Sequence, residues 1–312
     1  MRLIYHYCSM DTFNIIMKNK TLRLCDITKS NDKLEKLWIY NNLEVAMENA
    51  FKEMNLTMTP RDGDGEDTYL AITKSDLDEV VCLESLVVCF SKAADLLSQW
   101  RGYANDGCGF AIGFDQDLLQ KYLQRDERFR IEPIEYETYE QIKTLESDIK
   151  DGFLNCVLRN RLSSEQPLSG KGMDFSGYQD LFFDEYEEIS EDIVKQFEFS
   201  SCFMKNRAFI EEKEVRIVFA SNFSLDLEEG YELDTKIKGT TKLSLGKIDY
   251  FVRGRKLVPF IDMNFSKAVK DGLIKKIIIG PKADVSEKEL STFLWHNGFD
   301  GVEIEKSRAS YV

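Results

Sequence analysis

The segment Glu212-Lys213-Glu214-Val215-Arg216 holds the densest group of residues that could do chemistry. On a β-strand, residues two apart project from the same face, so Glu212, Glu214 and Arg216 are expected to line one cleft. Two carboxylates this close need a cation between them, or the pKa of one of them rises. Glycosyl chemistry uses such carboxylates to stabilise an oxocarbenium ion or to hold a sugar hydroxyl. A solvated strand edge is the alternative interpretation of the same residues.

A second candidate is His6, one of two histidines in 312 residues. It lies in Tyr5-His6-Tyr7-Cys8-Ser9, where a predicted strand ends and Ser9 can cap the helix that follows. A polar side chain at such a junction could meet a small ligand. The alternative is a core histidine whose ring nitrogens are hydrogen-bonded to the backbone.

Two segments in the first third of the chain add candidate ligand contacts. Ser91 follows an apolar strand-like run, and its hydroxyl could hold a ribose or cap a helix that extends to about residue 102. Trp100, Arg101 and Tyr103 suit stacking on a base and binding of a phosphate. Core packing is the alternative for Trp100.

Asn31 and His296 are weaker candidates. Asn31 lies in a polar loop with Asp32, three residues before Glu35, and the loop could cap the next helix or contact a ligand near His6. His296 precedes Asn297-Gly298, a helix C-cap pattern, and is expected to be structural.

Composition limits the class of function. The hydrophobic fraction of 43% and the charged fraction of 31% are those of an ordinary globular protein. A net charge of −14 argues against broad binding to duplex nucleic acid but leaves room for a local nucleotide pocket. No Walker-type loop, G-x-G-x-x-G or G-x-S-x-G motif is present. These absences argue against the common NTPase, Rossmann and hydrolase classes.

Cysteine usage and hydropathy indicate the compartment. The seven cysteines lie far apart with no C-x-x-C pair, which argues against a zinc site or a disulfide framework. We expect buried thiols and no bound metal. Since no signal-peptide pattern and no membrane-length apolar run is present, we expect a cytoplasmic protein with no membrane partner.

The apolar periodicity predicts an α+β chain: one domain over 1–312, with β-rich ends and an acidic helical insertion at about 138–207. Turn-rich loops are expected at 55–67 and 163–177, and the second could be a lid. Predicted helices cover 9–19, 34–54 and 285–295, and predicted strands cover 3–7, 21–24, 86–90, 108–114, 131–136, 215–220, 231–237, 241–245, 248–264, 275–279 and 302–304.

Taken in order, short motifs from residue 3 to about 311 resemble the DUF2971 family, a bacterial and phage-associated family of uncharacterised proteins. The chain departs from the family pattern at Lys33, where a proline is usual, and at Val215, where an aromatic residue is frequent. The motifs are Tyr5–Ser9, Asn31-Asp32 with Glu35, Cys89–Ser91, Trp100–Tyr103 with Gly109–Phe114, Glu212–Arg216, and Ile277–Pro281.

The opening segment also looks like the first motif of ADP-ribosyltransferases. That likeness implies mixed sheets with an ADP-ribosyltransferase-like core, and NAD as substrate. His6 would bind the NAD ribose, Ser91 would support the nicotinamide side, and Glu214 would stabilise the oxocarbenium ion. Glu212 would face the acceptor. Tyr7, Asn31, Trp100, Arg101, Tyr103 and Arg216 would complete the NAD-binding cleft.

The resemblance therefore implies an ADP-ribosyltransferase or an NAD glycohydrolase, with protein, nucleic acid or water as the acceptor. The expected biological role is that of a toxin or an antiphage-defence effector. The alternative is a non-catalytic antitoxin or sensor module that binds a partner protein or a nucleotide. In that alternative, Glu212, Glu214 and Arg216 form a structural ion-pair strand and His6 belongs to the core. A metal-dependent nuclease is a third class, which the spacing of the acidic residues does not favour.

Overall fold

A computed structural model describes residues 2–29, 36–56, 85–124, 126, 128–161, 186–220 and 243–311. The chain forms two compact units. Unit 1 comprises Met1–Lys29, Ser85–Ile134 and Ala208–Val312, and unit 2 comprises Ser30–Glu84 and Glu135–Arg207. The predicted helical insertion at 138–207 corresponds to the second segment of unit 2. The interpretation of the chain as a single domain stays a prediction.

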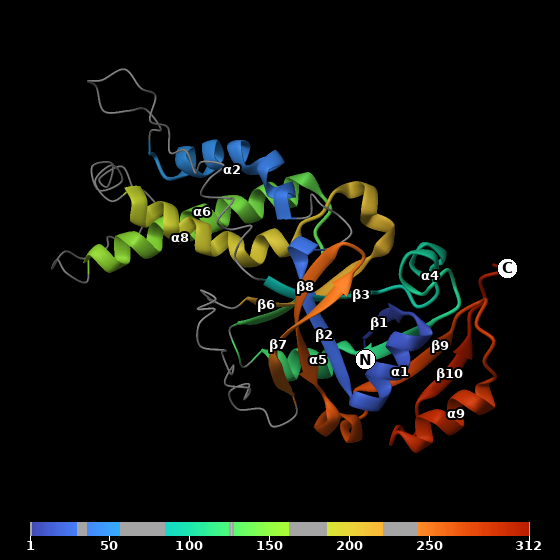
Figure 1. The fold of residues 1–312 in the computed structure, drawn as a ribbon. Coiled ribbons are helices and arrows are strands. Elements are labelled where there is room, and N and C mark those ends of the chain that lie inside the picture. Colours follow the sequence, from blue (N-terminus) through green and yellow to red (C-terminus); the bar gives the residue numbers. More distant parts are fainter. Residues whose placement is uncertain are drawn as a thin grey trace. The chain divides into compact units, whose positions relative to one another are not determined.

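Unit 1 is built on one mixed sheet of ten strands, which confirms the α+β class (Figure 1). The order is β10-β9-β4-β1-β3-β2-β8-β7, and β6 branches from β3 and also pairs with β5. The strands are β1 (Leu3–Cys8), β2 (Thr21–Asp26), β3 (Ser85–Ser91), β4 (Phe110–Asp115), β5 (Phe129–Pro133), β6 (Glu214–Ala220), β7 (Ser244–Arg253), β8 (Lys256–Asn264), β9 (Ile274–Ile279) and β10 (Glu303–Lys306).

The two faces of this sheet bury different side chains. One face carries the main core, where Phe90, Phe114 and Val215 pack with residues of the flanking helices. The other face carries a smaller cluster around Tyr5, Tyr7 and Trp100. We call these the core face and the α4 face. The helices of unit 1 are α1 (Met10–Asn19), α4 (Leu97–Tyr103), α5 (Gln116–Leu123) and α9 (Glu287–His296).

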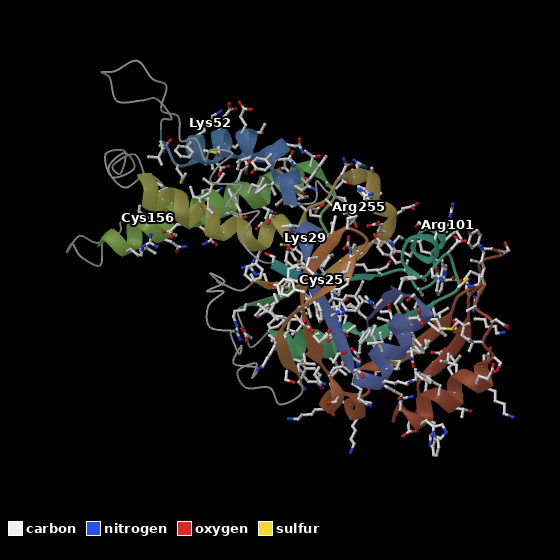
Figure 2. The ribbon with its side chains drawn as sticks, viewed as in Figure 1. Cys25, Lys29, Lys52, Arg101, Cys156 and Arg255 are labelled. Carbon is white, nitrogen blue, oxygen red and sulfur yellow. The ribbon has the colours of Figure 1, made fainter. Side chains whose placement is uncertain are left out.

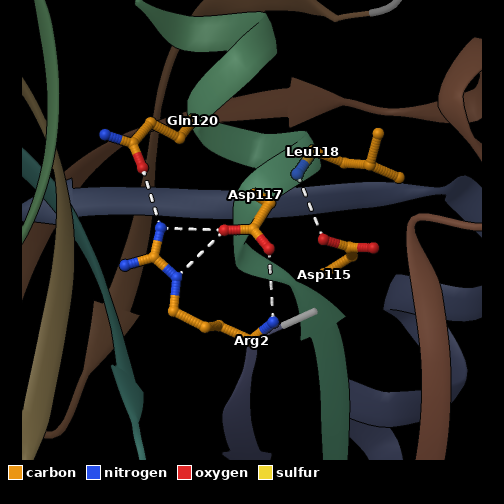
Figure 3. Close-up of polar contacts among 5 residues, drawn as sticks. All are labelled: Arg2, Asp115, Asp117, Leu118 and Gln120. Carbon is orange, nitrogen blue, oxygen red and sulfur yellow. Dashed lines mark hydrogen bonds and ion pairs between the residues drawn. The ribbon is translucent and has the colours of Figure 1, made fainter.

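Side-chain caps set where these helices begin. Ser9 accepts the amide of Thr12 at the start of α1, as predicted, and Ser286 and Glu289 form a capping box at the start of α9. Asp115 caps α5 through the amide of Leu118 at 3.1 Å (Figure 3).

The residue before the first strand is also held by side-chain contacts. Arg2 makes two guanidinium hydrogen bonds to Asp117, at 2.9 and 2.8 Å, and lies beside Gln120 (Figure 3). Both side chains of this ion pair are exposed, so it contributes less than about 1 kcal/mol.

Unit 2 is helical, with α2 (Tyr40–Glu53), α6 (Thr138–Arg161) and α8 (Tyr186–Ser200) packed around a separate apolar cluster. Gly152 marks the closest approach of α6 to α8, because a Cβ there would lie 2.8 Å from atoms of Ile193. Gln141 is buried and accepts hydrogen bonds from Trp38 and Asn42. Within the predicted insertion at 138–207, the described residues 138–161 and 186–200 are helical.

Several element predictions were wrong in detail. Residues 248–264 form a hairpin rather than one strand, because Gly254, at φ +61°, turns the chain between β7 and β8. The final helix begins at Glu287 instead of 285. The predicted strand 231–237, the 163–177 loop, most of the 55–67 loop, and Asn31, Asp32 and Glu35 lie outside the described residues.

Within the described part of the chain, no helix is long and apolar enough to cross a membrane.

Candidate functional site

Glu214 and Arg216 form a buried ion pair on β6. Arg216 Nε donates to Glu214 Oε1 at 2.7 Å, and its Nη2 donates to Oε2 at 3.1 Å. The two side chains are 1% and 7% exposed. The prediction that these residues share a strand face is confirmed. Because both carboxylate oxygens accept from a buried guanidinium, Glu214 is held in one orientation by its own strand.

Glu212 does not continue that face, and the prediction that it does was wrong. It ends a short 3₁₀ segment, Arg207–Glu212, and β6 begins at Glu214. Between them Lys213 adopts a left-handed conformation with φ +47°. This conformation costs a non-glycine residue about 1 kcal/mol and breaks the two-residue alternation of a strand. The Glu-x-Glu pair therefore splits into one buried and one half-buried carboxylate.

Ser91 ties the end of β3 to this turn. Its register partner on β6 is Glu214, and its hydroxyl donates to the backbone carbonyl of Glu212 at 2.6 Å. The same oxygen accepts the amide of Ala93. The predicted role as a helix cap was wrong, because β3 runs through Ser91 and α4 begins six residues later, after Leu96. Ser91 positions the Glu212 turn.

The carboxylate of Glu212 is half-buried and lies where α4, the Ser91 end of β3 and the Lys213 turn meet. The hydroxyl of Tyr103, on α4, donates to Glu212 Oε1 at 3.3 Å. The amide of Lys92 donates to the carbonyl of Lys213 at 2.9 Å, and both lysine side chains are exposed. We call Lys92, Tyr103, Glu212 and Lys213 the Glu212 rim. It presents a carboxylate, a phenol ring and two ammonium groups.

Trp100 and Tyr7 belong to the core beneath α4. Trp100 is fully buried, 4.8 Å from the ring of Tyr7, and its indole N–H donates to Asp95 at 2.6 Å. The Tyr7 hydroxyl donates to the carbonyl of Ala93 and accepts the amide of Leu96. Burial raises the pKa of Tyr7, so the hydroxyl stays protonated. The stacking role predicted for Trp100 gives way to its alternative, core packing.

Arg101 projects away from the Glu212 rim. Residues two apart on a helix lie about 200° apart around its axis, so Arg101 and Tyr103 leave α4 on opposite sides. Arg101 is exposed and lies 5.9 Å from the ring of Tyr311, near the C-terminus (Figure 2). Asp106 accepts from the Tyr311 hydroxyl and from Lys282 in the same cluster.

His6 lies on the core face, opposite Ser91 and Glu214. Tyr5 is the register partner of Ser91, so the next residue, His6, points to the other side of the sheet. Its Nδ1 donates to the carbonyl of Cys89 at 2.9 Å, and its ring lies 5.8 Å from that of Phe90. Burial lowers the pKa of His6, and the hydrogen bond to the carbonyl opposes this shift.

The structure therefore does not bring the predicted NAD-binding residues into one cleft. Ser91, Glu214 and Arg216 share the α4 face, and His6 is on the opposite face with its ring nitrogen bonded to the backbone. The alternative interpretation of His6 as a core histidine is the one that its contacts fit. Asn31, the remaining predicted contact, lies outside the described residues.

Sequence reasoning missed Lys92, Lys213 and Asp95. Nothing in the residue types indicated the left-handed conformation of Lys213, because lysine is uncommon in that conformation. Asp95 accepts from Trp100, from the Ser307 hydroxyl and from the amide of Arg308, and so anchors the C-terminal segment. From the sequence, Asp95 is an acidic residue just before a helix, a pattern that indicates a helix cap and not a contact with the C-terminal segment.

A comparison with known proteins finds one family model that matches part of the chain. Residues 99–217 match the family model described as "Protein of unknown function (DUF2971)". The match confirms the resemblance over this region, which runs from α4 to β6 and includes Tyr103, Glu212 and the buried ion pair. No curated protein and no solved structure matches the chain.

Proposed function

We propose that this chain, whose residues 99–217 match DUF2971, binds a ribose-containing nucleotide at the Glu212 rim. The observation that carries the proposal is the hydrogen bond from Tyr103 to Glu212, which holds a half-buried carboxylate beside an exposed aromatic ring. Lys92 and Lys213 lie on the two segments next to this turn, which a backbone hydrogen bond joins.

Each part of a nucleotide has a matching group in the rim. Glu212 can accept hydrogen bonds from the two hydroxyls of a ribose. The ring of Tyr103 can stack on a base, which is worth about 1–3 kcal/mol in single-stranded nucleic-acid complexes. The ammonium groups of Lys92 and Lys213 suit phosphate oxygens. The chain as a whole is acidic, so these two cations are expected to act locally, within a Debye length of about 8 Å.

The proposed role is binding and not catalysis through Glu214. A catalytic carboxylate that stabilises an oxocarbenium ion must present an oxygen to the sugar. Both oxygens of Glu214 accept hydrogen bonds from Arg216, and the pair is buried. Releasing Glu214 would break two hydrogen bonds between buried charged groups, which is costly. These contacts support the non-catalytic alternative of a nucleotide-binding sensor or antitoxin module.

Calorimetric titration of the full chain with ADP-ribose, ADP and adenosine tests the proposal. We expect Glu212→Gln and Tyr103→Ala each to weaken ADP-ribose binding by at least tenfold. The matched control is Glu211→Gln, a neighbouring exposed carboxylate, which should bind as the wild type does. The double change of Lys92 and Lys213 to Ala should weaken ADP more than adenosine. Absence of binding to all three ligands by the wild type would refute the proposal.

A second candidate is NAD consumption with Glu212, and not Glu214, facing the ribose. The same Tyr103–Glu212 contact favours it, because it orients an accessible carboxylate at the rim. In that reaction the bond from ribose C1′ to nicotinamide breaks, and nicotinamide leaves with the electron pair. Glu212 stabilises the cationic sugar until an acceptor oxygen bonds to C1′ and loses its proton.

Nicotinamide release from NAD separates the two candidates. Release by the wild type and by Glu211→Gln, together with loss in Glu212→Gln, would favour the enzyme. Binding of ADP-ribose without release of nicotinamide would favour the binding module. A toxin or antiphage-defence role, a partner protein from such a gene cassette, and a cytoplasmic location all stay predictions.

A further inference from the structure

The hairpin of β7 and β8 ends the sheet with an exposed strand edge. Among the strands that the structure describes, β7 is the last in the order and pairs with β8 alone (Figure 1). A bulge between Leu245 and Ile248 interrupts its first half, so the regular edge runs from Ile248 to Arg253. Unpaired strand edges can pair with another strand, and bulges are one device that limits this.

One face of the hairpin end is apolar and exposed. Val252 and its cross-strand partner Leu257 are 73% and 60% exposed, and Tyr250, two residues before Val252, is also exposed on this face. The opposite face carries Asp249, Phe251 and Arg253. The turn at Gly254-Arg255 closes the hairpin, and Arg255 is labelled there in Figure 2.

The backbone of β7 limits how a second strand could add to this edge. In an antiparallel ladder, alternate residues direct their N–H and C=O groups to one neighbour or to the other. Arg253 and Lys256 flank the two-residue turn, so Arg253 and Phe251 bond toward β8. Tyr250 and Val252 then direct theirs to the open edge. One observation agrees: Tyr250 lies opposite Pro259, which has no N–H. The Tyr250 amide donates to the side chain of Asp249, so pairing exchanges this hydrogen bond for one to the second copy.

Among the registers centred on Asp249, Tyr250 and Phe251, charge selects one for pairing of β7 with a second copy of itself. An antiparallel pair must place the edge-facing residues Tyr250 and Val252 opposite edge-facing residues. Centring the pair on Asp249 sets that carboxylate against its copy, and centring it on Tyr250 sets Lys247 against Arg253. Centring it on Phe251 sets Asp249 against Arg253 of the second copy, twice by symmetry. Opposite charges across a strand pair stabilise it, and like charges destabilise it.

We propose that two copies of this chain associate through β7 in the register centred on Phe251. Tyr250 of each copy then lies opposite Val252 of the other, which extends the exposed apolar face across the two-fold axis. The sheet of unit 1 continues from one copy into the next. This edge-to-edge pairing uses the same backbone contacts as β-strand addition, with an identical strand as the partner. It is independent of the nucleotide site.

The interface is short, so we expect a reversible dimer in the micromolar to near-millimolar range. Sedimentation equilibrium of the full chain over that range gives the dissociation constant. Val252→Asp and Asp249→Arg should each raise it at least about tenfold, the second because it sets two guanidinium groups against Arg253. Trp295→Asp, an exposed apolar residue on α9, is the matched control and should leave it unchanged.

A charge exchange tests the register itself. Arg253→Asp alone should weaken the dimer, and the double change Asp249→Arg with Arg253→Asp should restore it, because each new pair is again opposite in charge. Circular dichroism confirms that each variant is folded. A wild type that stays monomeric over the whole range would overturn the proposal. A dimer that ignores Val252→Asp, or that the double change fails to restore, would overturn it as well.

Discussion

Removal of Arg216 should destabilise the protein strongly, because it takes two hydrogen bonds and the guanidinium charge away from the buried carboxylate of Glu214. Arg216 makes two hydrogen bonds to Glu214, and the side chains are 1% and 7% exposed. Breaking such a pair from one side costs about 3–5 kcal/mol. Since domains of this kind have about 5–15 kcal/mol of stability in total, Arg216→Met should remove roughly a fifth or more of it.

Urea unfolding of the full chain, followed by circular dichroism, measures this change in the free energy of unfolding. The double variant Glu214→Leu with Arg216→Met should regain most of the loss, because an apolar pair of similar volume leaves no charge unpaired. The control is Arg2→Met, which removes an exposed bidentate pair with Asp117 and should cost less than about 1 kcal/mol. The reasoning fails if Arg216→Met costs no more than Arg2→Met, or if the double variant is as unstable as the single one.

Three further outcomes are expected. Burial lowers the pKa of His6, so the unfolded chain takes up a proton near pH 6.5 that the folded chain does not. The contribution of His6 to the free energy of unfolding is therefore complete above that pH, and below it the free energy falls by up to about 1.4 kcal/mol per pH unit. The melting temperature should drop between pH 7 and pH 5 in the wild type and in the control His296→Gln, and this drop should be smaller in His6→Gln. Equal profiles for the wild type and His6→Gln would contradict the role given to His6. Asp95→Ala should release the C-terminal segment, seen as faster amide hydrogen exchange at 307–311, and unchanged exchange would show that other contacts hold it. In urea, Gly109→Ala should lose at least about 2 kcal/mol of unfolding free energy, because the added Cβ would lie 2.1 Å from a carbonyl oxygen. Gly102→Ala, where a Cβ meets open space, should gain about 0.5–1 kcal/mol, and the opposite order would contradict the packing around these glycines.

Much of the fold was predictable because its signals are local. The apolar run at 86–90 and the strand at 3–7 need nothing beyond their own residues to be recognised, and Ser9 caps its helix through a contact three residues away. The hairpin at 244–264 was missed because its turn depends on one glycine, Gly254, within a long β-forming run. Pairing of distant strands, such as β3 with β6, leaves no comparable local signal.

The candidate site was less predictable than the fold. The prediction that Glu214 and Arg216 share a face was confirmed, because strand alternation holds from residue 214 onward. Extending that alternation one step back to Glu212 failed at a single backbone torsion. The face on which His6 lies also depends on strand register, since Tyr5 and not His6 pairs opposite Ser91. Neither the torsion nor the register can be read from residue types.

The left-handed turn at Lys213 gives the two glutamates different roles. In a continuous strand they would repel each other across one cleft, and each would compete for Arg216. The turn, whose Glu212 carbonyl accepts from Ser91, takes Glu212 off the face of β6, and the Glu212 carboxylate accepts from Tyr103. Glu214 keeps the two hydrogen bonds from Arg216. The strain of about 1 kcal/mol at Lys213 is small beside the several kcal/mol that an unpaired buried charge would cost. A ligand that binds at the rim therefore meets a carboxylate that a turn at the end of the sheet and the Tyr103 hydroxyl hold in place.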